Sequence, residues 1–374
     1  MRQVLYRFHL DGTVDLGPLG EIPLFGFGIV LLVWTLINVG LIAYIRKTKT
    51  GDDRKAAIQS TLVTWVIASI VIFILPNFAE RIPQGVPIFG YGFMVMLGIV
   101  AGGLTAGRRA ESVGIPKQVM WDTALAVVFI GIVGARLFFV IQYADKVFAG
   151  VNSLPGYLFA LVNLPDGGLV LYGGLIAGTA AFFARCYLKG YSPRLIADIA
   201  APSMLLGMAF GRIGCLFNGC CWGDRCDLPW AITFPQNSVT WDTMVKRGFL
   251  SPEALETMPL HPSQIYSSIN ALILSLLAAA YFHRREKDGQ VTLLVLIIYP
   301  ATRFLIEFIR GDEMGQFNTT FTISQWVSLL IISIGIVYGI WLSKQPAQLT
   351  RHVDRSPSSN GKNAPGKSSG MAKS

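Results

Sequence analysis

Nine apolar runs of about 20 residues constrain the fold of this chain more than any other feature. A helix of that length crosses the hydrocarbon core of a bilayer. Only 14% of the residues are charged and 52% are hydrophobic, whereas a soluble domain is about one-quarter charged. We therefore predict an all-α polytopic membrane protein with spans at residues 22–45, 56–75, 88–107, 119–141, 168–188, 195–215, 262–282, 291–309 and 323–342.

The positive charge of the chain follows this layout. The net charge is +9, but the Lys and Arg residues lie mainly in short loops between the apolar runs and near the C-terminus. Cytoplasmic segments of membrane proteins collect Lys and Arg. The distribution predicts that the N-terminus is outside and the C-terminus is cytoplasmic, and it argues against a nucleic-acid partner. No cleavable signal peptide is predicted, because the first apolar run is too long.

Two polar segments interrupt or follow the spans. Residues 216–261 form the longest outside segment and contain a group of cysteines, which predicts a small extracytoplasmic cap. Residues 343–374 are rich in Ser, Lys, Gly and Pro. That composition cannot bury enough apolar surface to fold, so we predict a disordered, basic cytoplasmic tail.

Four ionisable residues lie well inside the apolar runs, whereas Asp122 and Asp198 lie within about a turn of a cytoplasmic end; an ionisable residue inside a span costs a few kcal/mol and is a functional candidate by default. The four are Arg136, Arg212, Arg303 and Glu307, and Glu307 follows Arg303 by four residues on one helical face. The layout places all four toward the outer leaflet. Three cations and one carboxylate leave room for an anion, and phosphate suits the guanidinium fork. The alternative is that these arginines pair with backbone carbonyls or snorkel to the interface.

The cysteine group and one histidine leave several interpretations open. Cys215, Cys220, Cys221 and Cys226 have a spacing that matches neither a zinc ribbon nor a ferredoxin. At an oxidising outer surface, one or two disulfides are the first prediction, with free thiols or a metal site as alternatives. We assign no metal and no cofactor. His261 begins a span, where it either helps to start the helix or lines an outer site.

Four segments together resemble a known family, the prolipoprotein diacylglyceryl transferases. They are Tyr172-Gly173-Gly174-Leu175-Ile176, Gly211-Arg212-Ile213-Gly214-Cys215-Leu216-Phe217-Asn218-Gly219, His261-Pro262-Ser263-Gln264-Ile265-Tyr266 and Arg303-Phe304-Leu305-Ile306-Glu307-Phe308-Ile309-Arg310. The resemblance covers residues 86–342. It implies a seven-span core, preceded at 1–85 by an N-terminal extension with two further spans.

The resemblance also implies an activity, a location and partners. Such an enzyme moves the diacylglyceryl group of phosphatidylglycerol to the lipobox cysteine of a prolipoprotein and releases glycerol-1-phosphate. The reaction takes place at the outer face of the bacterial inner membrane. A monomer is expected, because nothing in the sequence demands a dimer. The alternatives are a non-catalytic lipid- or anion-binding relative and a redox or metal protein centred on the cysteines.

The site residues are carried over from the same resemblance. The expected catalytic residues are Arg212, Arg303, Tyr172, Glu307 and His261, and the expected phosphatidylglycerol-binding residues are Arg212, Arg136, Tyr91, Asn218, Gly173, Gly174 and Arg310. By this resemblance Arg212 and Arg303 hold the phosphate, and Glu307 fixes Arg303. One departure concerns the base. Many members have His where this chain has Tyr172, and a tyrosine with a pKa of about 10 is a poor base at neutral pH.

Overall fold

The computed structural model describes residues 3–15, 21–48, 50–77, 85–149, 153–162, 168–313, 315–316 and 318–350. Most of the predicted tail, residues 351–374, lies outside the described residues. Each of the nine predicted spans coincides with a long helix, so the prediction of an all-α polytopic membrane protein is confirmed. Within the described chain these helices are α1 (Ile29–Thr48), α2 (Gly51–Ile74), α3 (Gly90–Ser112), α4 (Lys117–Gln142), α7 (Leu171–Lys189), α8 (Pro193–Asn218), α10 (Ser263–Phe282), α11 (Gln290–Glu307) and α12 (Ile323–Ser343).

Eight of these helices, all except α7, are long and apolar enough to cross a membrane within the described residues. The chain divides into two compact units, each built from distant segments. The first unit combines Met1–Met96 with Gly211–Gln264, and the second combines Leu97–Phe210 with Ile265–Ser374.

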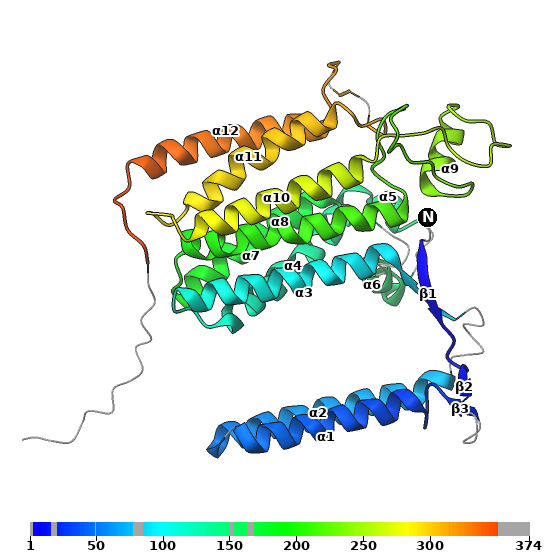
Figure 1. Cartoon of the computed structure of the whole chain (residues 1–374), viewed down its shortest axis with the longest axis vertical. Helices are drawn as coiled ribbons and strands as arrows, with labels where there is room; N and C mark the ends of the chain where they lie inside the picture. The colour runs from blue at the N-terminus through cyan, green and yellow to red at the C-terminus, as the bar shows by residue number, and fades with distance from the viewer. Residues whose placement is uncertain are drawn as a thin grey trace, which may run out of the picture. The chain divides into compact units, whose positions relative to one another are not determined.

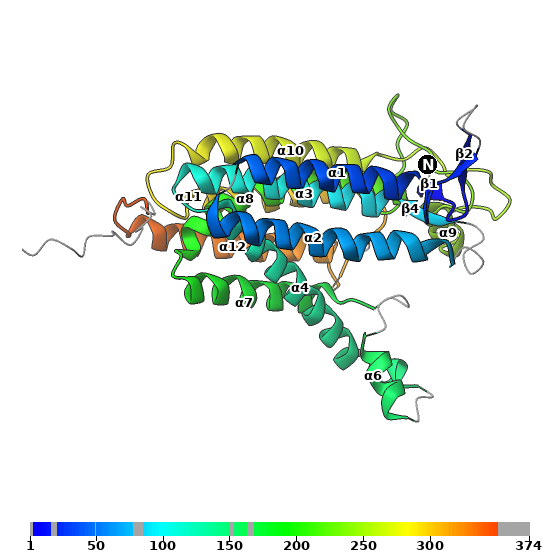
Figure 2. The ribbon, with the colours of Figure 1, turned by 90° about the horizontal axis from the view of Figure 1, so that it is seen from below.

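The first unit contains small sheets and a helical hairpin. Strand β1 (Val4–Phe8) pairs antiparallel with β4 (Val86–Phe89), and β2 (Thr13–Asp15) pairs antiparallel with β3 (Glu21–Pro23). Helices α1 and α2 lie side by side (Figures 1 and 2). Most of their apolar side chains are not covered by other parts of the protein, as expected for surfaces that face lipid.

The first predicted span starts later than its apolar run does. The run begins at Ile22, but α1 begins at Ile29. Between them, Gly26 has a φ of +71°, which a helix cannot contain. The Pro and Gly residues of this stretch therefore delay the helix by about two turns.

The predicted cap segment has a small core of its own. Trp222, Phe234, Met244 and Leu260 are buried together. Helix α9 (Val239–Lys246) begins where the hydroxyl of Ser238 accepts the backbone N–H of Trp241. Isolated β-bridges, such as the antiparallel bridge between Ile232 and Leu260, join the loops of this segment. These contacts give the segment a folded structure.

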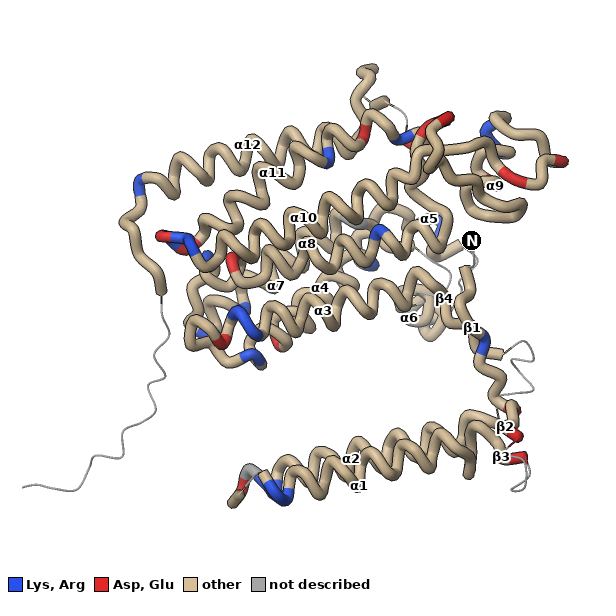
Figure 3. Tube along the Cα trace, viewed as in Figure 1, with Lys and Arg blue, Asp and Glu red and all other residues tan. Residues whose placement is uncertain are grey.

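The second unit contains the main helical core. Helix α4 packs along α7, and α11 packs along α12. The short helices α5 (Ala144–Val147) and α6 (Leu154–Val162) follow α4. The buried core includes Leu195, Ile199 and Phe282. Figure 3 shows that charged residues gather mainly at the helix ends, with few along the helices, as the apolar runs require.

One buried carboxylate fixes the start of α11. Asp198 on α8 is fully buried and accepts the backbone N–H groups of Gly289 at 2.7 Å and Thr292 at 2.8 Å. The side chain of Arg285 lies 3.7 Å away, with Asp288 beside it. Asp198 therefore serves as a tertiary cap for the free N–H groups of the helix start.

Candidate active site

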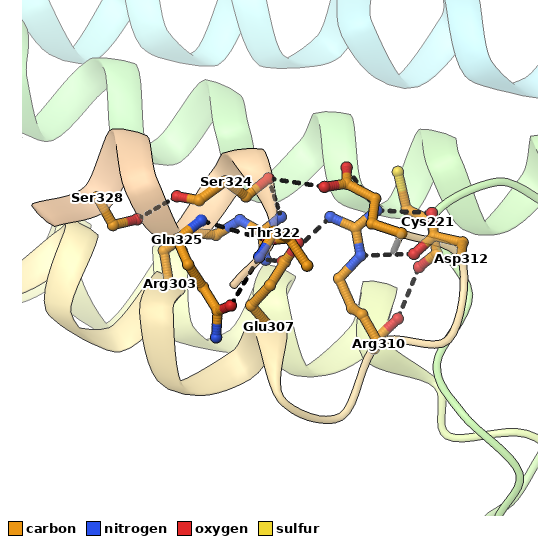
Figure 4. Close-up of polar contacts among 11 residues, drawn as sticks. Cys221, Arg303, Glu307, Arg310, Asp312, Thr322, Ser324, Gln325 and Ser328 are labelled. Atoms are coloured by element: carbon orange, nitrogen blue, oxygen red, sulfur yellow. Dashed lines mark hydrogen bonds and ion pairs between the residues drawn. The ribbon is translucent and has the colours of Figure 1, made fainter. Parts of the chain in front are cut away.

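Glu307 is the centre of a buried charge cluster at the end of α11 (Figure 4). Arg303, one turn earlier, forms an ion pair with Glu307 through Nη1. Arg310, after the helix, brings Nη1 to 3.3 Å from Oε2 of the same carboxylate. The hydroxyl of Thr322 donates to Oε1 at 2.8 Å. The predicted pair between Arg303 and Glu307 is confirmed, and these three buried charged groups carry one net positive charge.

Two further carboxylates lie at the more exposed edge of this cluster. Asp312 accepts hydrogen bonds from Nε of Arg310 at 2.8 Å and from Nη2 at 2.6 Å, which is a bidentate pair. Glu313 lies 3.5 Å from Nη2 of Arg310. Burial raises the pKa of Glu313, and the neighbouring charge of Glu307 adds to this effect while Arg310 opposes it. The cluster is therefore more balanced in charge than the sequence predicted.

A serine connects the two sides of the cluster. Ser324, on the first turn of α12, accepts a hydrogen bond from Nη2 of Arg303 at 3.3 Å and donates one to Glu313 at 3.4 Å. Thr322 caps the same helix in a capping box with Gln325. The start of α12 therefore orients both Arg303 and Glu307, because a capped helix end is a rigid platform.

Arg136 makes the contacts that the alternative interpretation of the intramembrane arginines predicted. Its guanidinium donates to the backbone carbonyls of Ala160 at 2.7 Å, Leu161 at 3.0 Å and Gly168 at 3.1 Å. It also lies 5.3 Å from the ring centre of Phe139. These contacts join α4 to α6 and to the segment before α7, so they favour a bracing role over phosphate binding.

The glycines at the start of α7 are packing residues. A Cβ built on Gly173 would overlap the carbonyl oxygen of Gly134 and the side chain of Phe138, both on α4. A Cβ on Gly174 would lie 3.2 Å from the carbonyl oxygen of Gly131. Small residues let two membrane helices approach closely. Gly173 and Gly174 therefore pack α7 against α4, and their contact with phosphatidylglycerol stays a prediction.

Tyr172 precedes this packed pair on the first turn of α7 and is 48% exposed. Its ring therefore lies at the surface of the second unit. The position is compatible with contact to a lipid headgroup, and the catalytic role of Tyr172 stays a prediction. A tyrosine hydroxyl there can donate a hydrogen bond, but it is a poor acceptor of the proton from a thiol.

A second group of predicted residues comes together in the first unit. Tyr91 is the second residue of α3, and Gly214 of α8 packs against it, because a Cβ on Gly214 would lie 3.1 Å from the tyrosine ring. Tyr91 is within electrostatic range of Arg212 and of three cysteine thiols. Asn218 ends α8, and its carbonyl accepts a 3.4 Å hydrogen bond from Gln3. Tyr91 and Arg212 therefore share one site.

All five cysteines, each within the described chain, are free thiols. The first prediction of disulfides in the cap is therefore not what the structure has. The sulfur atoms of Cys215, Cys220 and Cys221 all lie within 4.8 Å of one another. Cys226 is separate, and its sulfur accepts the backbone N–H of Leu228 at 3.4 Å. Free thiols and a metal site, the two alternatives, remain compatible with this cluster.

The residues after His261 hold the cysteine loop in place. The hydroxyl of Ser263 donates to the carbonyl of Cys221 at 2.6 Å, and the amide of Gln264 donates to the carbonyl of Cys220 at 2.8 Å. The backbone N–H of His261 donates to the carbonyl of Asp224 at 2.9 Å. Sequence reasoning missed the roles of Ser263 and Gln264. Their signal was present, because a polar Ser-Gln pair starts an otherwise apolar helix.

Comparison with known proteins agrees with the motifs that form this site. The sequence matches the family model described as prolipoprotein diacylglyceryl transferase over residues 78–341. The chain belongs to this family. The match contains all four segments that resemble the family in sequence, and it contains both the Arg303 cluster and the Tyr91–Arg212 site.

Three relatives illustrate how much of the chain is shared. A phosphatidylglycerol–prolipoprotein diacylglyceryl transferase of Clostridium tetani is 34% identical, covering 67% of this chain and 92% of its own length. A second such transferase, from Clostridium perfringens, is 32% identical over 68% of this chain and 90% of its own. One from Rhodopirellula baltica is 28% identical over 84% of this chain and 85% of its own.

Proposed function

We propose that this chain transfers the diacylglyceryl group of phosphatidylglycerol to the lipobox cysteine thiol of prolipoproteins. The product is a thioether, and glycerol-1-phosphate leaves. Family membership supports this proposal, since relatives that match most of the chain carry this activity in their names. The observation that carries it is the buried ion pair of Arg303 and Glu307, because this pair holds the Arg303 guanidinium in a fixed orientation within a membrane-spanning helix.

The chemistry requires cations at the leaving group. The thiolate sulfur attacks the glycerol carbon that bears the phosphodiester, a carbon–sulfur bond forms, and the carbon–oxygen bond breaks. The electron pair passes to the phosphate oxygen, where negative charge grows in the transition state. Preorganised donors at that oxygen are worth the most in an environment that excludes water. We assign this role to Arg303 and Arg212.

The other predicted residues receive supporting roles. Glu307 is a positioning residue, since it pairs with both Arg303 and Arg310 and its side chain is fully buried. Arg310, whose buried guanidinium pairs with Glu307 and Asp312, is the further predicted contact of the headgroup. Tyr91 and Tyr172 offer hydroxyl groups to the headgroup. His261 remains the candidate base within the segment that holds the cysteine loop.

We also propose the bacterial inner membrane as the location, with the N-terminus outside and the C-terminus in the cytoplasm. The distribution of Lys and Arg supports that orientation. In this orientation the end of α11 that carries Glu307 lies toward the outer leaflet. Reporter fusions at the two ends would test it, with activity of an extracytoplasmic reporter expected at the N-terminus and not at the C-terminus.

The function is tested by a transfer assay with purified full-length chain in detergent. Phosphatidylglycerol and a lipobox peptide are added, and the peptide mass is followed. We expect a diacylglyceryl gain that Arg303→Ala abolishes. Arg225→Ala is the matched control, because the Arg225 side chain is 69% exposed in the cap. A wild-type chain that binds lipid but never modifies the peptide would instead support the non-catalytic relative, which Tyr172 favours.

A further inference from the structure

Three thiols that the proposed reaction does not use converge in the first unit. The sulfur atoms of Cys215, Cys220 and Cys221 lie within 4.8 Å of one another. Tetrahedral zinc with sulfur at about 2.3 Å needs neighbouring sulfurs about 3.8 Å apart. The 4.8 Å limit on the distances between these three sulfurs is about 1 Å above that separation. A disulfide would use two of the thiols and leave the third over, whereas one thiophilic cation uses all three.

The backbone around these thiols is held by side chains from elsewhere in the unit. The carbonyl groups of Gly219, Cys220 and Cys221 accept hydrogen bonds from Thr240 at 2.5 Å, Gln264 at 2.8 Å and Ser263 at 2.6 Å, respectively. Cys221 has a φ of +59°, a conformation that a residue with a side chain adopts only when its surroundings enforce it. The loop is thus preorganised around the three sulfurs, as a binding site requires.

An unmet hydrogen-bond acceptor lies on one of these anchoring groups. Gln264 is only 1% exposed, and its amide nitrogen bonds to the Cys220 carbonyl. Its Oε1 has no hydrogen-bond partner among the described residues. A buried acceptor of this kind costs about 1–3 kcal/mol unless a partner arrives. A peptide N–H next to a bound thiol would supply that partner.

The cluster is also close to the arginine assigned to phosphate. Arg212 and Cys215 are three residues apart on α8, so they are neighbours on one face of the helix. Tyr91 lies within electrostatic range of Arg212 and of all three thiols. A thiol that is bound at the cluster would therefore face the phosphodiester that Arg212 holds.

We propose that Cys215, Cys220 and Cys221 bind one Zn²⁺ ion, whose open fourth position takes the lipobox cysteine thiol. This inference rests on the transferase function proposed above. Catalytic zinc sites have three protein ligands and one open position. A thiol that coordinates the metal is deprotonated outright. Such a site removes the need for a strong base, which Tyr172 cannot provide.

The step balances without any further reactant. The substrate thiol gives its proton to water as it binds the zinc. Its sulfur electron pair then forms the bond to the glycerol carbon of phosphatidylglycerol. The carbon–oxygen bond breaks, its electron pair stays on the phosphate oxygen, and glycerol phosphate recovers a proton from water. The neutral thioether is a weaker ligand than a thiolate, so the product leaves and the fourth position reopens.

The test uses the full-length chain, reduced, purified in detergent, stripped with a chelator and supplied with Zn²⁺ alone. We expect one zinc per chain, and the same in Cys226→Ser, whose sulfur lies outside the cluster. Cys215→Ser and Cys220→Ser should weaken zinc binding at least tenfold. Folding of each variant is checked by its thermal midpoint. Failure of the folded wild-type chain to bind zinc would overturn the proposal.

A second measurement on the wild-type chain probes the open position. With Co²⁺ in place of zinc, the thiolate-to-metal absorption should change when a lipobox peptide is added, and not with a peptide that has Ser for the lipobox Cys. An unchanged spectrum would overturn the substrate-thiol assignment. Undiminished transfer in stripped chain would overturn the zinc proposal and leave the transferase standing. A cysteine-specific spectral change without any transfer would count against the transferase and still support the metal site.

Discussion

Replacing Glu307 with glutamine tests the role of the buried charge cluster most sharply. The substitution keeps the shape of the side chain and removes the charge that Arg303 and Arg310 share. Removing one partner of a buried ion pair costs about 3–5 kcal/mol. The lower end applies here, because Arg310 keeps its bidentate pair with Asp312 at 2.6 and 2.8 Å. Stability should therefore fall by about 3 kcal/mol.

The same substitution should lower the rate more than it lowers binding. Without the Glu307 carboxylate, Arg303 keeps its hydrogen bond to Ser324 but loses the charged partner that orients its guanidinium. Loss of one oriented donor at a developing oxyanion costs about 100-fold in kcat. An interaction that acts in the transition state changes kcat while leaving KM nearly constant. We expect that pattern in a titration of phosphatidylglycerol at fixed peptide concentration.

Two companion variants make the result decisive. Glu313→Gln changes a carboxylate that is 38% exposed and 3.5 Å from Arg310, so its effect should stay below about 1 kcal/mol. Glu307→Asp keeps the charge and should recover part of kcat. A folded Glu307→Gln chain with wild-type kcat would refute the positioning role, and so would equal losses in Glu307→Gln and Glu313→Gln.

Three further predictions concern packing, capping and pH. Gly173→Ala should lose about 1–3 kcal/mol from overlap with α4, while Gly40→Ala, which meets nothing within 4 Å, should not; thermal midpoints in detergent compare them. Asp198→Ala should lower the free energy of unfolding by about 3–5 kcal/mol, because it removes the acceptor of the N–H groups at the start of α11 and leaves Arg285 buried without this partner. Asp122 is partly exposed, so Asp122→Ala should lower it far less in the same measurement. The raised pKa of Glu313 gives stability that is present below the ordinary glutamate pKa of about 4.3 and is lost as the pH rises through the raised value. The midpoint of the wild-type chain relative to Glu313→Gln should therefore fall across that interval, and parallel curves would contradict the assignment.

The helices were predictable because the membrane leaves few alternatives. A bilayer requires backbone groups to be satisfied within each span, so a long apolar run implies a helix. The first span was placed too early because Gly26 breaks the run in a way that hydropathy does not detect. The pair of Arg303 and Glu307 was predictable from its spacing of four residues on one helix.

The tertiary partners were not predictable from such local patterns. Asp312 follows the last turn of α11, and no pattern in the surrounding sequence predicts its bidentate pair with Arg310. Arg136 was counted as a cation available to phosphate, but its guanidinium donates to backbone carbonyls that lie 24 and 32 residues later in the chain. The cysteines were assigned to disulfides from their compartment, whereas their arrangement depends on Ser263 and Gln264, more than 40 residues away.

The most direct test of the account measures both products of one reaction. Wild-type chain, phosphatidylglycerol and a lipobox peptide are combined in water enriched in heavy oxygen, and the peptide and the glycerol phosphate are weighed by mass spectrometry. Attack by sulfur on carbon predicts one diacylglyceryl thioether for each glycerol phosphate released, with no heavy oxygen in the phosphate. Release of glycerol phosphate without a gain in peptide mass, or with heavy oxygen in its phosphate, would show hydrolysis and contradict the account.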